Sequence, residues 1–136
     1  METASQIKSL GQLALHVAGI PGNLAKLVEF EEFEAARANF EPAVPADIKE
    51  ILLAFDQSIR TAEECLGSMN DQKALGTWRL TIHGKEALAK PRVDVLRSVM
   101  LNHWYHHRGQ LSVYLRLLEV PVPVIYGRSA DENPFA

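Results

Sequence analysis

The chain has 136 residues, of which 47% are hydrophobic and 23% charged, and we expect it to form a single domain over residues 1–136. Its net charge of −3 excludes the broad cationic surface that attracts nucleic acid, so we expect no nucleic-acid partner. No apolar run approaches the ~20 residues that span a bilayer, and the first residues do not form a signal peptide, so we expect a cytoplasmic protein without a membrane partner.

The first periodic segment runs from about Ser5 to about Ala38 and predicts a helix. Its apolar residues recur every three or four positions, as they do on one face of a helix, and they are Leu10, Leu13, Val17, Leu24, Leu27 and Val28. The stretch AGIPGN interrupts this pattern. Its Gly19, Pro21 and Gly22 predict a kink or a break in the helix.

A second helix is predicted after a turn that contains Pro42 and Pro45. Its apolar stripe alternates spacings of four and three and consists of Ile48, Leu52, Phe55, Ile59, Ala62, Leu66 and Met69. Cys65 is the single cysteine, which excludes an intrachain disulfide. Because Cys65 lies among apolar residues at helical spacing, we expect it to be a buried side chain rather than a nucleophile.

The segment LGTWRLTIHGKEALAKP, residues 75–91, has a different texture. β-Branched and aromatic residues alternate with polar ones, and Gly76 and Gly84 punctuate them. This pattern predicts an extended stretch or a weak hairpin. His83 lies beside Gly84, and we expect it at the surface.

A last helix is predicted from Pro91, which suits a first helical turn, to about Glu119, where Pro121 and Pro123 stop it. The remaining residues form a loop. Because every long segment is helical, we expect an all-α bundle with short connections.

Three histidines lie within five positions of this last helix, in NHWYHHRGQL. At about 100° per residue, His103 and His107 lie within about 40° of one another on its apolar face, whereas His106 lies at the edge of that face. Histidines four residues apart can bind one divalent ion, because their Cβ atoms are only about 5–6 Å apart. His16 borders the inward face of the first helix and is the natural third ligand. Three protein ligands leave a coordination position open, which is the arrangement that supports chemistry.

Ordinary packing is the alternative to a metal site. A single histidine such as His16 is more often a hydrogen-bonded core residue than a ligand. Two rings on one aliphatic face each need a hydrogen-bond or metal partner, because each buried nitrogen left without one destabilises the fold by about 1–3 kcal/mol. A shared ion would satisfy both rings, so for the pair we weigh metal binding and packing equally. The zinc-protease motif H-E-x-x-H is excluded because Trp104 occupies the position of its glutamate. A Ser-His-Asp triad is unsupported as well, because no serine lies in a nucleophile elbow.

Other residues of the last helix are candidates for binding a cofactor or substrate. Gln110 falls close to His103 in helical angle and could orient a ring or contact a substrate. Tyr114 could offer its hydroxyl to a bound molecule, although packing is the commoner role of such a side chain. His106 completes this set. Gly109 in mid-helix is unfavourable by about 1 kcal/mol relative to alanine, which indicates a close neighbour such as a partner helix.

The sequence resembles the DinB/YfiT-like family. Residues 101–132, LNHWYHHRGQLSVYLRLLEVPVPVIYGRSADE, are similar to the last helix and tail of that family, whose motif reads H-x-x-x-H-R-G-Q. Residues 9–22, SLGQLALHVAGIPG, resemble its earlier L-x-x-H segment, and residues 76–97 resemble its linker before the last helix. The likeness covers nearly the whole chain.

The resemblance implies a four-helix bundle of down-up-up-down character, frequently dimeric, with a divalent ion held by three histidines. Position by position, these ligands would be His16, His103 and His107, and the ion would be nickel or zinc. Characterised relatives include S-transferases and isomerases that use a low-molecular-weight thiol. Members of the family have a helix before the first histidine segment, whereas this chain begins only about 15 residues ahead of His16. We therefore expect the first helix to be absent or truncated, and a homodimer to cover the face left open.

The three histidines predict a divalent-metal-binding protein that acts on a small molecule. The resemblance implies a thiol-dependent S-transferase, and the same metal chemistry would also suit a hydrolase. The ion would lower the pKa of a bound water or thiol. A non-catalytic metal-dependent binding or stress-response module is the alternative, because it needs the same histidines but no turnover. A bundle whose histidines never meet a metal is the third hypothesis.

Overall fold

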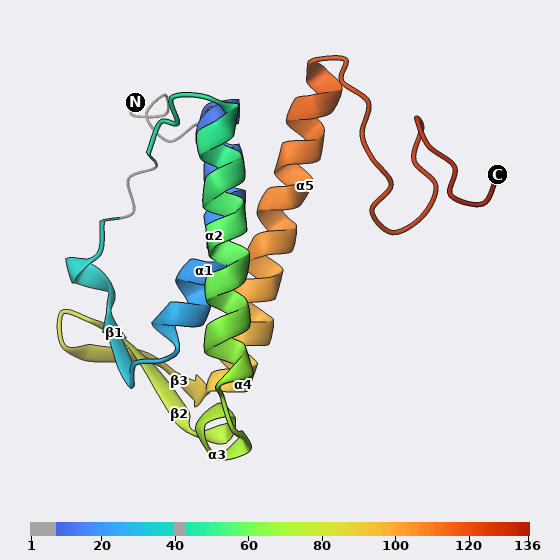
Figure 1. The fold of residues 1–136 in the computed structure, drawn as a ribbon. Helices are drawn as coiled ribbons and strands as arrows, with labels where there is room; N and C mark the ends of the chain where they lie inside the picture. The colour runs from blue at the N-terminus through green and yellow to red at the C-terminus, as the bar shows by residue number, and fades with distance from the viewer. Residues whose placement is uncertain (1–7, 40–42) are drawn as a thin grey trace.

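The computed structural model describes residues 8–39 and 43–136. Its long helices pack side by side, and a small sheet lies at one end of them (Figure 1). The first helix, α1, spans Leu10–Leu27. Ser9 caps it, because the Ser9 hydroxyl accepts from the Gln12 backbone N–H while the Gln12 side chain accepts from the Ser9 backbone N–H. The predicted residues 5–7 of this helix and the predicted turn at Pro42 lie outside the described residues. The helix continues through Pro21, so of the predicted kink or break the break is ruled out, and the kink stays a prediction.

The second helix, α2, spans Ile48–Gly67 and packs along α1. Asp47 caps it by accepting from the backbone N–H of Glu50. Cys65 is buried against α1, as predicted. The two helices approach closely at Gly22, where a Cβ atom would lie 2.7 Å from the backbone oxygen of Ser58. The Gly22 N–H donates to the Ser58 hydroxyl at 2.7 Å, so a small residue and a short polar one together set this crossing.

The prediction of an all-α four-helix bundle was wrong, because the described residues include a three-stranded mixed sheet. Its strands are β1 (Glu32–Glu34), β2 (Thr77–Ile82) and β3 (Lys85–Pro91), in the order β1-β2-β3. β2 and β3 form the predicted hairpin, and β1 pairs with β2 in parallel. The sheet covers one end of the helices (Figure 1).

The first helix ends at Leu27 rather than near Ala38 because distant residues hold the chain beyond it. The buried Arg92 guanidinium donates to the carbonyl oxygens of Val28 at 2.7 Å and Phe30 at 3.0 Å. Those carbonyls therefore find partners outside a helix. Val28 and Phe33 also pack in one core cluster with Trp78, which favours the turn into β1.

The turn between β2 and β3 is tied to β1 by Glu34. Its carboxylate accepts from the backbone N–H groups of His83 at 3.0 Å and Gly84 at 2.9 Å. Both residues have positive φ, 52° and 72°, as a tight hairpin turn requires. His83 is exposed, as predicted.

The last helix is continuous from Arg92 to Leu117, but it has three parts. They are α4 (Arg92–Val95), a π-helical segment η2 (Leu96–Leu101) and α5 (Asn102–Leu117). A π-helical turn admits an extra residue and changes the direction of the side chains that follow it. In this protein the histidines begin immediately after that turn. Two short helices complete the fold, η1 (Ala35–Arg37) and α3 (Asp71–Leu75).

Packing leaves much apolar surface open. α1 contacts both α2 and α5, but the first half of the α2 stripe is not covered: Ile48, Leu52 and Phe55 are 63%, 56% and 40% exposed. The tail after α5 extends away from the helices and is held near its base by an ion pair between Arg116 and Asp131 at 2.6 Å (Figure 1). Within residues 8–39 and 43–136, no helix combines the length and apolarity that a membrane crossing requires.

Candidate metal centre

The structure brings together the three histidines singled out in the sequence. His16 comes from α1, and His103 and His107 come from α5. Each ring offers one nitrogen, and these nitrogens all lie within 4.8 Å of one another. The Nε2 atoms of His16 and His103 are 3.1 Å apart. The ring centroids are 4.5–5.2 Å apart, so the three imidazoles lie close enough together to share one ion.

These distances fit a shared ion. Two nitrogens bound at about 2.0–2.1 Å with a tetrahedral angle between them are about 3.3 Å apart, close to the 3.1 Å between His16 and His103. An N–H···N hydrogen bond between His16 and His103 would have a similar length and would satisfy those two nitrogens. It would not involve His107, whereas a bound ion would bind all three rings. Among the described residues this cluster contains histidines only, with no carboxylate or thiolate.

The histidines are poised in the neutral form that binds metals. Burial, and then the neighbouring His107, lowers the pKa of His16 to about 4. Burial also lowers the pKa of His103, and the neighbouring His107 adds to this effect. Burial lowers the pKa of His107 as well, although its hydrogen bond with Gln110 acts in the opposite direction. At neutral pH the three rings therefore carry lone pairs rather than extra protons.

Gln110 fixes which nitrogen of His107 carries the proton. The His107 Nδ1 atom lies 2.7 Å from the Gln110 side-chain oxygen. An amide oxygen only accepts, so Nδ1–H is the donor and Nε2 keeps its lone pair. The helical angle placed Gln110 near His103, but the structure places it on His107, one turn away.

The other candidates of the last helix lie outside the cluster. His106 is exposed, and its ring meets the edge of the His107 ring with centroids 4.9 Å apart. The Tyr114 hydroxyl donates to the Lys8 carbonyl at 2.8 Å, just before α1. A role for either residue in substrate binding stays a prediction. Among the described residues of this chain Gly109 has no close neighbour, because a Cβ there would meet nothing within 4 Å.

One contact beside the cluster was missed from the sequence. The indole N–H of Trp104 donates to the backbone oxygen of Val17 at 3.0 Å, which joins α5 to α1. Pro21 was the available signal, because a proline in a helix leaves the carbonyl four residues before it without its helical donor. The sequence does not say which donor replaces it.

A cavity of about 760 Å³ opens beside His16 and His103. It lies along α1 and α2 and reaches the segment after β1. Amide and hydroxyl side chains line it, among them Asn23 of α1 with Gln57 and Thr61 of α2, together with apolar residues such as Phe33. Its described lining includes no carboxylate. The volume is in the range of sites that hold small organic molecules.

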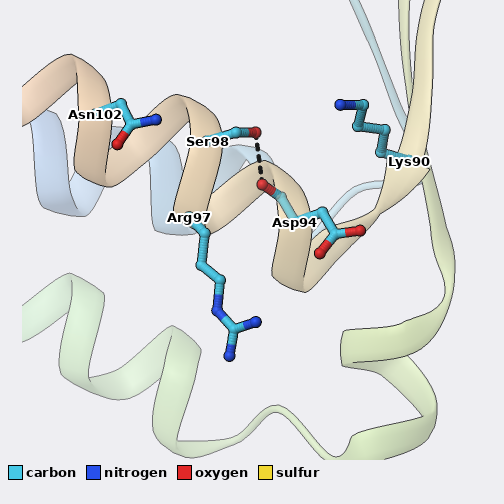
Figure 2. Close-up of a pocket in the computed structure, with 5 residues that line it drawn as sticks. All are labelled: Lys90, Asp94, Arg97, Ser98 and Asn102. Atoms are coloured by element: carbon cyan, nitrogen blue, oxygen red, sulfur yellow. Dashed lines mark hydrogen bonds between the residues drawn. The ribbon is translucent and has the colours of Figure 1, made fainter.

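A second hollow of about 490 Å³ lies on the outward side of the last helix (Figure 2). Its described lining is Lys90, Asp94, Arg97, Ser98 and Asn102. Within it the Ser98 hydroxyl donates to the Asp94 carbonyl at 2.6 Å, a bond internal to the helix. The two hollows share no described residue, so the histidine cluster belongs to the larger cavity alone.

The comparisons with known proteins agree with one another. The model of the DinB family matches residues 1–133. A solved structure described as a DinB-like protein from Bacillus cereus aligns with a TM-score of 0.65 and 22% identity, over 92% of this chain and 78% of that chain. At this identity the likeness shows the fold alone. No curated protein matches the chain.

Proposed function

The chain belongs to the DinB family, and from this premise we propose that His16, His103 and His107 hold one divalent cation for chemistry on a small molecule. The observation that carries the proposal is the convergence of three neutral imidazole nitrogens from two helices. Nickel or zinc is the proposed ion, because imidazole ligands suit both metals.

Three neutral ligands would leave the charge of the ion uncompensated. A divalent ion bound there would lower the pKa of a water or thiol in its open coordination position, so that a nucleophile forms near neutral pH. Gln110 supports this role by holding His107 with Nε2 unprotonated. The cavity beside His16 offers amide and hydroxyl groups that could hydrogen-bond a substrate, and its apolar residues would exclude water from it.

The proposed reaction is transfer of a low-molecular-weight thiol to an electrophile, with metal-dependent hydrolysis as the second reaction of the same kind of site. One observation favours a non-catalytic binding module instead. Neither the cluster nor the described cavity lining includes an aspartate or glutamate that could act as a general base. We keep this module as the alternative function.

We further propose that the protein is a homodimer in which a second copy covers the open stripe of α2. Ile48, Leu52 and Phe55 support this, since large apolar side chains in a continuous helical row seldom stay in water. Size-exclusion chromatography with light scattering tests the proposal. The wild type should elute as a dimer and Leu52→Lys as a monomer, and a wild-type monomer at micromolar concentration would contradict it.

Metal analysis of protein purified without a histidine tag tests the site. The wild type should carry one zinc or nickel ion per chain, and His103→Ala should carry none. His83→Asn is the matched control, because it removes an exposed histidine outside the cluster and asparagine tolerates positive φ. Full occupancy of His103→Ala would refute the assignment.

Turnover separates the enzyme from the binding module. The metal-loaded protein would be incubated with glutathione, bacillithiol or mycothiol and a panel of electrophiles, and thiol consumption would be followed. Metal-dependent turnover that His103→Ala lacks supports the transferase. Tight binding of a thiol without product supports the module.

A further inference from the structure

Pro21 leaves one backbone oxygen of α1 without its usual partner. In an α-helix the carbonyl of residue 17 accepts from the N–H of residue 21, and proline has no N–H. The helix nevertheless continues from Leu10 to Leu27 through Pro21. The free oxygen of Val17 is therefore available to a donor from another element.

Trp104 of α5 supplies that donor. Its indole N–H lies 3.0 Å from the Val17 oxygen. Both partners directly follow proposed ligands, since Val17 follows His16 and Trp104 follows His103. The interhelical bond therefore lies one residue away from the Nε2 atoms of His16 and His103, which are 3.1 Å apart.

The two helices contribute unequally to the cluster. His103 and His107 lie one turn apart on α5, so α5 alone fixes their separation. The position of His16 relative to them depends on how α1 docks on α5. A metal site tolerates only small errors in this docking, because ligand distances must agree to within about 0.2 Å.

We propose that Trp104 is a positioning residue for the metal centre: its hydrogen bond to the oxygen that Pro21 leaves free sets the docking of α1 on α5 and holds His16 against His103 and His107. The inference rests on the proposed metal site. Trp104 does not touch the ion, so it acts through His16.

The central variant is Trp104→Phe, which keeps an aromatic ring and removes the donor. Zinc affinity, measured by competition with a chromophoric chelator, should fall by about 10–100-fold, the usual effect of losing a group that orients a ligand. The absorption spectrum of the cobalt-loaded protein should also change, because the spectrum reports the number and arrangement of ligands.

A matched control exists at the C-terminal end of α1. The Trp78 indole N–H donates to the Leu27 carbonyl at 3.3 Å, far along α1 from His16. Trp78→Phe removes the same kind of bond and should lower the melting temperature while leaving zinc affinity and the cobalt spectrum unchanged. Equal losses of zinc affinity in the two variants would overturn the proposal.

The double variant Trp104→Phe with Pro21→Ala separates positioning from stability. Alanine at 21 restores an N–H that can bond to the Val17 oxygen within α1, so the melting temperature lost in Trp104→Phe should return. The tie to α5 is still absent, so zinc affinity should stay low. Wild-type affinity in Trp104→Phe, or recovery of affinity together with stability in the double variant, would overturn the proposal.

A metal-free measurement keeps the inference testable if the wild type binds no zinc, which would refute the proposed function instead. Long-range ¹H–¹⁵N spectra of the imidazole rings report the contact between His16 and His103. These signals should move in Trp104→Phe and stay in place in Trp78→Phe. Unchanged ring signals in Trp104→Phe would overturn the positioning role whatever the metal result.

Discussion

His107 and Gln110 form a hydrogen bond of 2.7 Å between Nδ1 and the amide oxygen, one helical turn apart on α5. The bond leaves Nε2 of His107 as the nitrogen without a proton. It also restrains the rotation of the ring, because turning the ring would break this hydrogen bond. A residue outside the cluster thus decides how one proposed ligand presents its lone pair.

Replacing Gln110 with alanine should weaken zinc binding by about tenfold without unfolding the protein, because the ring of His107 loses its orienting partner. The measurement is chelator competition at pH 7.5. Asn102→Ala is the control, since Asn102 lines the outward hollow of the same helix. Equal zinc affinities of Gln110→Ala and the wild type would show that the hydrogen bond does not prepare His107.

His16 should make the metal-free protein less stable as the pH falls from about 6.5 to about 4. Burial and the neighbouring His107 lower its pKa from 6.5 to about 4. The unfolded chain therefore binds a proton in this window that the folded chain does not, so the free energy of unfolding falls with the pH. Below about pH 4 both states are protonated and His16 causes no further loss. The ring is only partly buried, so solvent reduces the size of the effect.

Melting temperatures measured with a chelator between pH 7.5 and 4.5 check this sign. The wild type should lose stability more steeply than His16→Gln, which has no group that titrates at this position. Parallel curves for the two proteins would mean that His16 is as easily protonated in the folded state as in the unfolded one.

Local patterns were sufficient for several parts of the fold and the cluster. The α2 stripe has an unbroken period, and the hairpin carries Gly84 at its turn, so both were predictable. The pair His103 and His107 was predictable because their separation depends on one helix alone. His16 was chosen because it borders the inward face of the first helix, and the family resemblance led independently to the same residue.

Distant contacts decided the features that the sequence did not reveal. Residues 29–38 are rich in glutamate and alanine, which favour a helix, but Arg92 and Trp78 draw this segment into a sheet. The π-helical turn before Asn102 has no sequence signature that we recognise. The bond between Trp104 and Val17 depends on the docking of two helices, which no local period encodes.

Gly109→Ala should stabilise the protein by about 0.5–1 kcal/mol, because alanine is the better helix former and its Cβ would meet nothing within 4 Å. Gly22→Ala is the opposite case. Its Cβ would lie 2.7 Å from the Ser58 backbone oxygen, so α1 and α2 must separate, at about 1–3 kcal/mol. Denaturant unfolding of the two variants measures both. If Gly109→Ala instead lowered the free energy of unfolding, a neighbour outside this chain, such as a second copy, would lie against Gly109.

Arg92→Met should destabilise the protein by about 3 kcal/mol, because it removes the guanidinium that donates to backbone carbonyls in the region where α1 turns into β1. Arg92 is 6% exposed and donates to the oxygens of Val28 and Phe30, and more distantly to Lys73 at 3.4 Å. Each buried acceptor left unpaired is unfavourable by about 1–3 kcal/mol.

Arg97→Met is the matched control for this loss, since Arg97 is an exposed arginine on the same helix (Figure 2). It should change the free energy of unfolding by less than about 0.5 kcal/mol. Arg92→Lys keeps the charge but has a single ammonium in place of the forked guanidinium. Its free energy of unfolding should therefore lie between those of Arg92→Met and Arg97→Met. Equal stabilities of Arg92→Met and Arg97→Met in denaturant unfolding would mean that water, rather than Arg92, satisfies these carbonyls.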